Sequence, residues 1–170
     1  MELRYEFVVP YPPEAVESVL LSPAFAVEAE RSRRDTVISS QVVLESESES
    51  ETRFRIISDE YDRNRLGQID RSRRILGVTH CHWTTTSETL QWRYEGGHDG
   101  FVSVSGATRL QPHPEGTLVH ALVTLKVTMP VVGRLIAKAV AGLFRKGFEG
   151  EEFAMRQQLF AQQAPAAARA

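Results

Sequence analysis

Two histidines separated by one residue, His80 and His82, have the spacing in this chain that comes closest to a metal site. On a strand, residues two apart point to the same face, so both imidazoles could bind one zinc or copper ion. Two ligands do not complete a site, and the sequence places no third ligand beside them. We therefore expect neither a metal nor a cofactor.

The face that these histidines occupy depends on the parity of their strand. If Leu76 and Val78 point inward, the histidines line the interior. If Ile75, Cys81 and Trp83 point inward, the histidines face outward, and the apolar and aromatic content favours this second arrangement. Cys81, the one cysteine, would then be a buried and unreactive thiol rather than a nucleophile.

The chain carries none of the common signatures of hydrolytic or phosphate chemistry. It contains no Gly-x-Ser-x-Gly motif, no His-Glu-x-x-His motif and no glycine-rich phosphate loop. If catalysis occurred, the candidate acid and base groups would be Arg93, Tyr94, His80 and His82. We expect binding rather than catalysis.

An unusual charged segment runs from Glu45 to Glu51, where glutamate and serine alternate. We interpret it as a solvated hairpin tip, whose carboxylates would repel one another unless a cation or a basic partner bound them. Several arginines follow between residues 53 and 74. Charge balance within this region is the simple interpretation, and a transient contact of these arginines with a membrane surface is the alternative.

Composition places the chain among ordinary globular proteins. It has 170 residues, of which 42% are hydrophobic and 25% charged, and its formal net charge is −2. We expect one domain over residues 1–161 and a disordered tail over 162–170. The charge excludes the basic footprint of a nucleic-acid-binding protein. The charged start of the chain and the lone cysteine favour a reduced, cytoplasmic location, and no apolar run is long enough to span a bilayer.

The elements that must position these residues begin with a strand over 2–9, whose apolar and polar residues alternate. Two short helices are predicted next, from Pro12 to Leu21 and, after a Ser22 cap, from Pro23 to a basic cluster. Six β-rich stretches separated by turns then predict an antiparallel meander, at 36–44, 52–57, 75–86, 89–94, 101–110 and 117–129. The stretch 59–73 has too few apolar residues to decide between a loop and a short helix.

The strongest helical signal follows Pro130, where apolar residues recur every three or four positions. This pattern predicts a long amphipathic C-terminal helix. Glycines inside a helix cost about 1 kcal/mol each relative to alanine. Gly147 and Gly150 therefore predict a kink or a break.

This order of elements resembles the helix-grip fold of the START-like, Bet v 1-like (SRPBCC) superfamily. The opening YEFVVPYPPEAV at 5–16 is similar to that superfamily's first strand and helix. The strand 117–129 followed by PVVGRLI resembles the end of DUF2505, a family of uncharacterised bacterial proteins, although Ala137 and Lys138 stand where an acidic residue usually follows. The resemblance implies an α+β fold, in which a seven-stranded curved antiparallel sheet, two short helices and one long C-terminal helix enclose a cavity. It implies an apolar ligand and no established activity.

A single helix about 10 Å wide cannot fill a strongly curved sheet, so this fold leaves space for a ligand. Side-chain alternation places Val123 and Leu125 on the inner face of one strand, and Trp92 and Tyr94 on that of another. Ordinary core packing is the competing interpretation. The candidate ligand-binding residues are Trp83, Trp92, Tyr94, Val123, Leu125, Leu135, Ile136, Val140 and Leu143.

The sequence thus predicts the binding or carriage of a small hydrophobic molecule, either lipid-like or polyketide-like. Two alternatives stay open. One is a cyclase- or dehydratase-type enzyme that uses the same cavity, and the other is a protein-interaction module.

Overall fold

The computed structural model describes residues 1–63, 68–96, 102–128 and 133–163, without the side chains of 133–137, 139 and 163. The elements are β1 (Glu2–Val9), α1 (Pro13–Leu20), α2 (Pro23–Arg33), β2 (Val37–Glu47), β3 (Glu51–Arg63), β4 (Ile69–Thr84), the 3-10 turn η1 (Thr85–Ser87), β5 (Thr89–Glu95), β6 (Val102–His113), β7 (Gly116–Val127) and α3 (Gly133–Gln163). No helix in these ranges is both long and apolar enough to cross a membrane.

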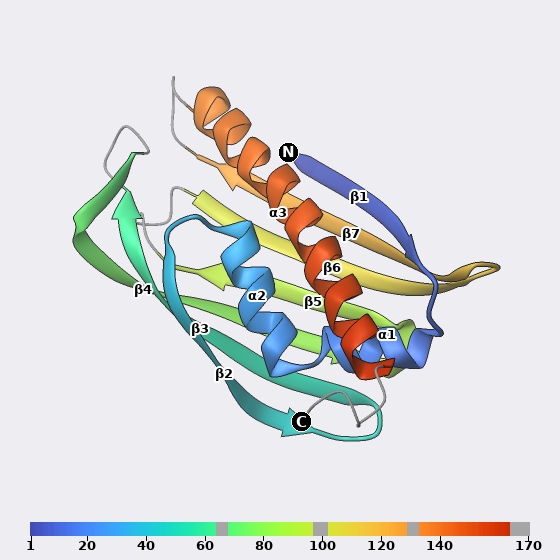
Figure 1. The fold of residues 1–170 in the computed structure, drawn as a ribbon. Helices are drawn as coiled ribbons and strands as arrows, with labels where there is room; N and C mark the ends of the chain where they lie inside the picture. Colours follow the sequence, from blue (N-terminus) through green and yellow to red (C-terminus); the bar gives the residue numbers. More distant parts are fainter. Residues whose placement is uncertain (64–67, 97–101, 129–132, 164–170) are drawn as a thin grey trace.

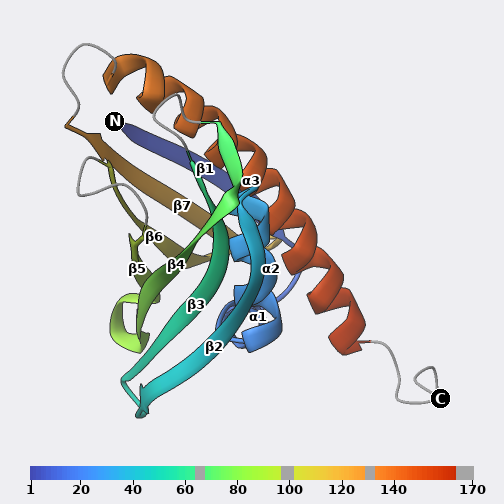
Figure 2. The same cartoon turned by 90° about the vertical axis from the view of Figure 1, so that its left-hand side faces the viewer.

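The seven strands form one sheet in the order β1-β7-β6-β5-β4-β3-β2. Every neighbouring pair is antiparallel, so β2 to β7 make a meander and β1 adds to its far edge. The sheet curves, and α3 runs along it with α2 at its side (Figure 1). All three helices lie on the same face of the sheet (Figure 2). The predicted α+β architecture, with two short helices and one long C-terminal helix, is confirmed.

Residue alternation decides which face of each strand is inside. In β7, Val119, Ala121, Val123 and Leu125 are buried, whereas the residues between them are more exposed, as their alternation predicts. At the start of α2, the Ser22 hydroxyl accepts a hydrogen bond of 3.2 Å from the Phe25 amide, and Pro23 takes the first helical position. The local signals therefore agree with the tertiary structure at these points.

In its described parts, the stretch 59–73 is neither the loop nor the short helix that the sequence left open, and 64–67 lie outside the described residues. Its residues continue β3 to Arg63 and start β4 at Ile69. The inward positions at the end of β3 hold Ser58, Glu60 and Asp62, all buried. A hydrophobic pattern cannot mark a strand whose inward face is polar, because the alternation that reveals such a strand is missing.

The sequence predicted a kink or a break at the glycines of α3, and the break is wrong, because the helix runs continuously from Gly133 to Gln163 (Figure 1). Its glycines instead allow α2 and α3 to approach closely. A Cβ on Gly147 would lie 2.9 Å from the Arg33 Cα, and one on Gly150 would lie 2.8 Å from the Ser32 Oγ. The same helix ends two residues into the tail that was expected to start at 162, and 164–170 lie outside the described residues.

The two kinds of glycine in α3 should respond in opposite ways to alanine. We expect Gly147→Ala to lower the free energy of unfolding by about 1–3 kcal/mol, because the added methyl group meets the backbone of α2. Gly142 has no neighbour within 4 Å of an added Cβ, so Gly142→Ala should raise the free energy of unfolding by about 1 kcal/mol. Urea denaturation followed by circular dichroism measures both changes, and a similar rise in both variants would contradict the close packing.

Candidate functional site

The layer between the sheet and α3 contains most of the residues that the sequence assigned to a ligand site. Trp83, Val123 and Leu125 are each 1% exposed. Trp92 of β5 is also buried, and its ring stacks on Phe144 of α3 with centroids 6.3 Å apart. Tyr94, Val140 and Leu143 are half-buried. Leu135 and Ile136 belong to α3, but their side chains lie outside the described residues. The structure therefore brings six members of the set to one apolar layer, whereas Leu143 is not among the described residues that pack against this core.

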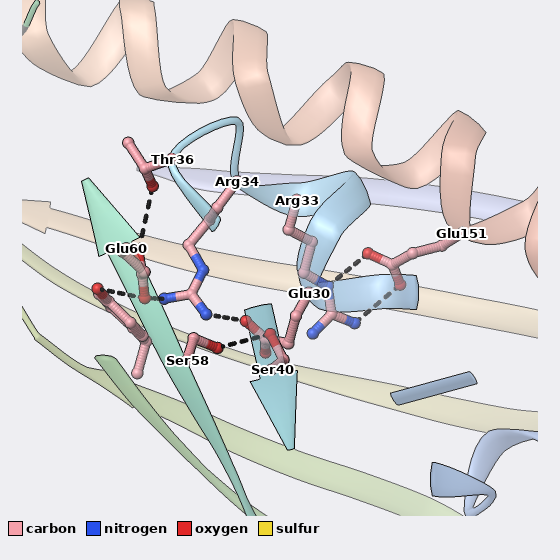
Figure 3. Close-up of polar contacts among 9 residues, drawn as sticks. Glu30, Arg33, Arg34, Thr36, Ser40, Ser58, Glu60 and Glu151 are labelled. Atoms are coloured by element: carbon pink, nitrogen blue, oxygen red, sulfur yellow. Dashed lines mark hydrogen bonds and ion pairs between the residues drawn. The ribbon is translucent and has the colours of Figure 1, made fainter. Parts of the chain in front are cut away.

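A buried ion pair, which the sequence did not reveal, joins α2 to α3 within this layer. The Arg33 guanidinium donates two hydrogen bonds to the Glu151 carboxylate, from Nε and, at 2.8 Å, from Nη2 (Figure 3). Arg33 is 9% exposed and Glu151 is 7% exposed. Such a bidentate contact is the strong form of an arginine–carboxylate pair. It connects two residues that are 118 positions apart in the sequence.

A second arginine, Arg34, lies between two carboxylates (Figure 3). Its Nη1 donates to Glu60 Oε1 at 2.8 Å, and its Nη2 donates to Glu30. Glu60 also accepts hydrogen bonds from the Thr36 hydroxyl at 3.1 Å and from the Tyr94 hydroxyl at 3.2 Å. We call Glu30, Arg33, Arg34, Glu60 and Glu151 the buried charge cluster.

Both arginines of the buried charge cluster lie over aromatic rings of β5. The Arg33 guanidinium carbon is 4.6 Å from the centroid of the Trp92 ring, and that of Arg34 is 3.9 Å from the Tyr94 ring. A guanidinium within about 6 Å of a ring centroid is attracted by the ring's quadrupole. The charge cluster is therefore in contact with two of the three aromatic residues that the sequence placed in the ligand site.

The surroundings act differently on the two arginines. Burial alone would lower the pKa of the Arg33 guanidinium, but the charge and hydrogen bonds of Glu151 outweigh burial and raise this pKa above its ordinary value. Burial lowers the pKa of Arg34, and Glu60 offsets only part of that effect. Burial also raises the pKa of the Tyr94 phenol, so at neutral pH the hydroxyl keeps its proton and serves as a hydrogen-bond donor.

Two glycines make room for the aromatic rings on the inner surface of the sheet. A Cβ on Gly106 would lie 2.5 Å from both Trp92 Cζ2 and the Leu122 carbonyl oxygen. A Cβ on Gly77 would collide with the Glu60 carboxylate and lie 2.9 Å from the Tyr94 ring. The sequence offered only the glycines themselves as a signal, and glycine in a strand commonly marks such a close approach.

The histidines lie on the opposite, outer face of the sheet, as the apolar content of their strand predicted. His82 Nε2 is 2.9 Å from Glu51 Oε2, and His80 Nε2 is 3.3 Å from Glu95 Oε2. Both line shallow, open hollows of the outer surface, of about 270 and 460 Å³, and Arg93 lines the larger. Among the side chains described, no group of three His, Cys, Asp or Glu could hold a metal ion.

Cys81 lies on the inner face, 6% exposed, and burial raises the pKa of its thiol to about 12. The thiol is therefore neutral at physiological pH. This agrees with the expectation of a buried and unreactive cysteine.

The acidic repeat forms the turn between β2 and β3, which confirms its interpretation as a hairpin tip. Glu45 pairs with Arg55 at 2.6 Å, and Glu51 pairs with Arg53 at 3.3 Å. Arginines of β3 and β4 pair with Asp35, Asp59 and Asp62. These ion pairs support charge balance as the role of the arginines, and contact with a membrane surface stays a prediction.

The comparison with known families agrees with this geometry. A family model described as "Protein of unknown function (DUF2505)" matches residues 4–159. The chain belongs to the DUF2505 family. None of the curated proteins matches this sequence.

Solved structures show that the DUF2505 chain has the helix-grip fold of START and Bet v 1 proteins. A protein from Thermus thermophilus is 19% identical with a TM-score of 0.64, over 96% of this chain and 100% of that one. A START superfamily protein from Mycobacterium smegmatis is 15% identical with a TM-score of 0.57, over 95% and 98%. The Zhui aromatase/cyclase from Streptomyces sp. R1128 is 12% identical with a TM-score of 0.58, over 98% and 97%. The TM-scores establish a shared fold, and at such low sequence identity they do not establish a shared activity.

Proposed function

We propose that this DUF2505 protein binds or carries a small hydrophobic molecule, lipid-like or polyketide-like, between the sheet and α3. The observation that carries the proposal is the buried charge cluster in contact with Trp92 and Tyr94. A buried ion pair contributes little net stability compared with apolar side chains of the same volume. An apolar layer that contains a few convergent polar groups is instead the usual composition of a ligand site.

The residues proposed to contact the molecule are those of the predicted set. The sheet would contribute Trp83 of β4, Trp92 and Tyr94 of β5, and Val123 and Leu125 of β7. Helix α3 would contribute Leu135, Ile136, Val140 and Leu143. Trp83, Val123 and Leu125 are 1% exposed, so the layer is closed here. Binding therefore requires α3 or its side chains to move away from the sheet.

The same geometry favours binding over catalysis. Of the four acid and base groups that the sequence offered, Tyr94 alone lies beside the inner layer, while His80, His82 and Arg93 line hollows of the outer face. Proton transfer needs a group within hydrogen-bond reach of the substrate. The similarity to an aromatase/cyclase keeps the enzyme as an alternative, and any turnover that is lost in a folded Tyr94→Phe variant would support it.

Binding can be measured with the fluorescent fatty acid cis-parinaric acid. Both tryptophans of the chain are buried in the inner layer, so quenching of their emission reports on its uptake. We expect Leu125→Arg to weaken binding at least tenfold, because it puts a charge into an apolar layer. Leu122→Arg is the matched control, since Leu122 lies on the same strand but lines the outer hollow, and it should bind as the natural protein does.

A folded Leu125→Arg protein with unchanged affinity would refute this site. Because that variant puts a charge at a buried position and can fail to fold, Val140→Trp provides a second test. Val140 is half-buried on α3, and the larger ring should fill the space that the probe needs. Native mass spectrometry of protein purified from its own host, followed by extraction, then identifies the chemical class of any bound molecule.

A further inference from the structure

Two polar atoms on the inner face of β4 have no hydrogen-bond partner among the described residues. They are the hydroxyl oxygen Oγ1 of Thr79 and the indole nitrogen Nε1 of Trp83. Each of these residues is 1% exposed, so bulk solvent does not reach either atom. A buried polar atom without a partner is costly, and native structures contain few of them.

Three other polar side chains buried in this protein do have partners. Ser58 is 3.0 Å from the Ser40 hydroxyl, Thr117 donates to the Tyr11 carbonyl at 2.7 Å, and Thr36 donates to Glu60 at 3.1 Å. The fold thus satisfies buried hydroxyl groups at the edges of the layer. A third such atom, Arg55 Nε on β3, forms an ion pair with Glu45, whereas the two without any partner among the described residues are both on β4, which crosses the proposed ligand site.

The sheet register places these atoms at the two ends of an apolar wall. Thr79 is paired with Ile56 and Tyr94, and Trp83 is paired with Thr52 and Leu90. Cys81, between them, is paired with Phe54 and Trp92, and all three are buried. At about 3.3 Å per residue, the Cα atoms of Thr79 and Trp83 are about 13 Å apart.

We propose that Thr79 and Trp83 are specificity-determining residues that hydrogen-bond to oxygen atoms at two ends of the bound molecule. This inference rests on the proposed function and narrows its ligand class. The indole N–H only donates, so it requires a carbonyl, ether or hydroxyl oxygen, whereas the Thr79 hydroxyl can donate or accept. The ligand is therefore an elongated apolar molecule that carries oxygen near both ends, rather than one with a single polar head.

The test compares 1,10-decanediol with 1-decanol as competitors that displace cis-parinaric acid. The two probes share one apolar chain and differ in the second terminal hydroxyl. We expect the natural protein to prefer the diol about fivefold, the usual effect of one neutral hydrogen bond. Thr79→Val removes the hydroxyl at constant shape, so it should abolish the preference without loss of stability, and Thr79→Ser should restore the preference.

Trp83→Phe should abolish the preference in the same way. The matched control is Trp92→Phe, which also removes an indole ring, but one whose nitrogen is not among the unpartnered atoms. This variant should weaken the binding of both probes equally. Equal displacement by both probes, or an unchanged preference in Thr79→Val, would overturn this inference and leave the proposed function intact. If cis-parinaric acid itself does not bind, the proposed function fails and this inference fails with it.

Discussion

Replacing Glu151 with leucine should lower the free energy of unfolding by about 3–5 kcal/mol. The substitution leaves the Arg33 guanidinium buried over Trp92 without the carboxylate that accepts its two hydrogen bonds. An uncompensated buried charge is among the most destabilising changes that a single substitution can make. Urea denaturation at low temperature, followed by circular dichroism, measures the loss.

Two further variants show whether the loss comes from the buried pair. Glu149→Leu removes an exposed carboxylate from the same helix and should change stability by less than about 0.5 kcal/mol. Arg33→Met combined with Glu151→Leu removes both charges and should recover most of the loss, because apolar side chains can replace a buried pair at little cost. If the double variant is no more stable than Glu151→Leu alone, the pair does not act as a unit.

The apolar part of the layer could be predicted because alternation reports it directly. Val123 and Leu125 stand at every second position of β7, and Cys81 and Trp83 do the same in β4. Their side chains are buried as the pattern requires. The outward position of the histidines followed from the same parity.

The charged part of the layer could not be predicted because its pattern looks like a surface. Arg33 and Arg34 at the end of a helix match cations that favour a helix C-terminus in solvent. Their burial depends on partners distant in sequence, since Glu151 lies 118 residues from Arg33. Glu60 and Asp62 occupy inward positions of β3, and this is the signal that could have indicated a polar interior.

The glycines of α3 show that sequence-based prediction can also fail for a single residue. Helix propensity predicts that Gly147 weakens the helix, and that prediction holds for an isolated helix. In the protein, the absence of a side chain at Gly147 allows the backbone of α2 to come close, with the Arg33 Cα 2.9 Å from where a Cβ would stand. Tertiary packing decides the role of such a residue, and local propensity cannot show it.

Replacing Glu60 with leucine should have an effect as large as that of Glu151→Leu. Glu60 is 2% exposed and accepts hydrogen bonds from Arg34, Thr36 and Tyr94. Its loss leaves Arg34 with Glu30 alone and leaves two hydroxyl groups without an acceptor. We expect the free energy of unfolding to fall by about 3–5 kcal/mol, measured by urea denaturation.

The neighbouring residue provides a control on the same strand, because Asp59 pairs with Arg74 at 3.0 Å on the exposed side. Asp59→Leu should change stability by no more than about 1 kcal/mol, as is usual for exposed ion pairs. Since Tyr94 loses both its acceptor and a nearby negative charge, the pKa of its phenol should fall in Glu60→Leu, which an absorbance titration can follow. Equal effects of Asp59→Leu and Glu60→Leu would mean that the carboxylate of Glu60 is not buried in solution, and the charge cluster would then carry no argument for a ligand site.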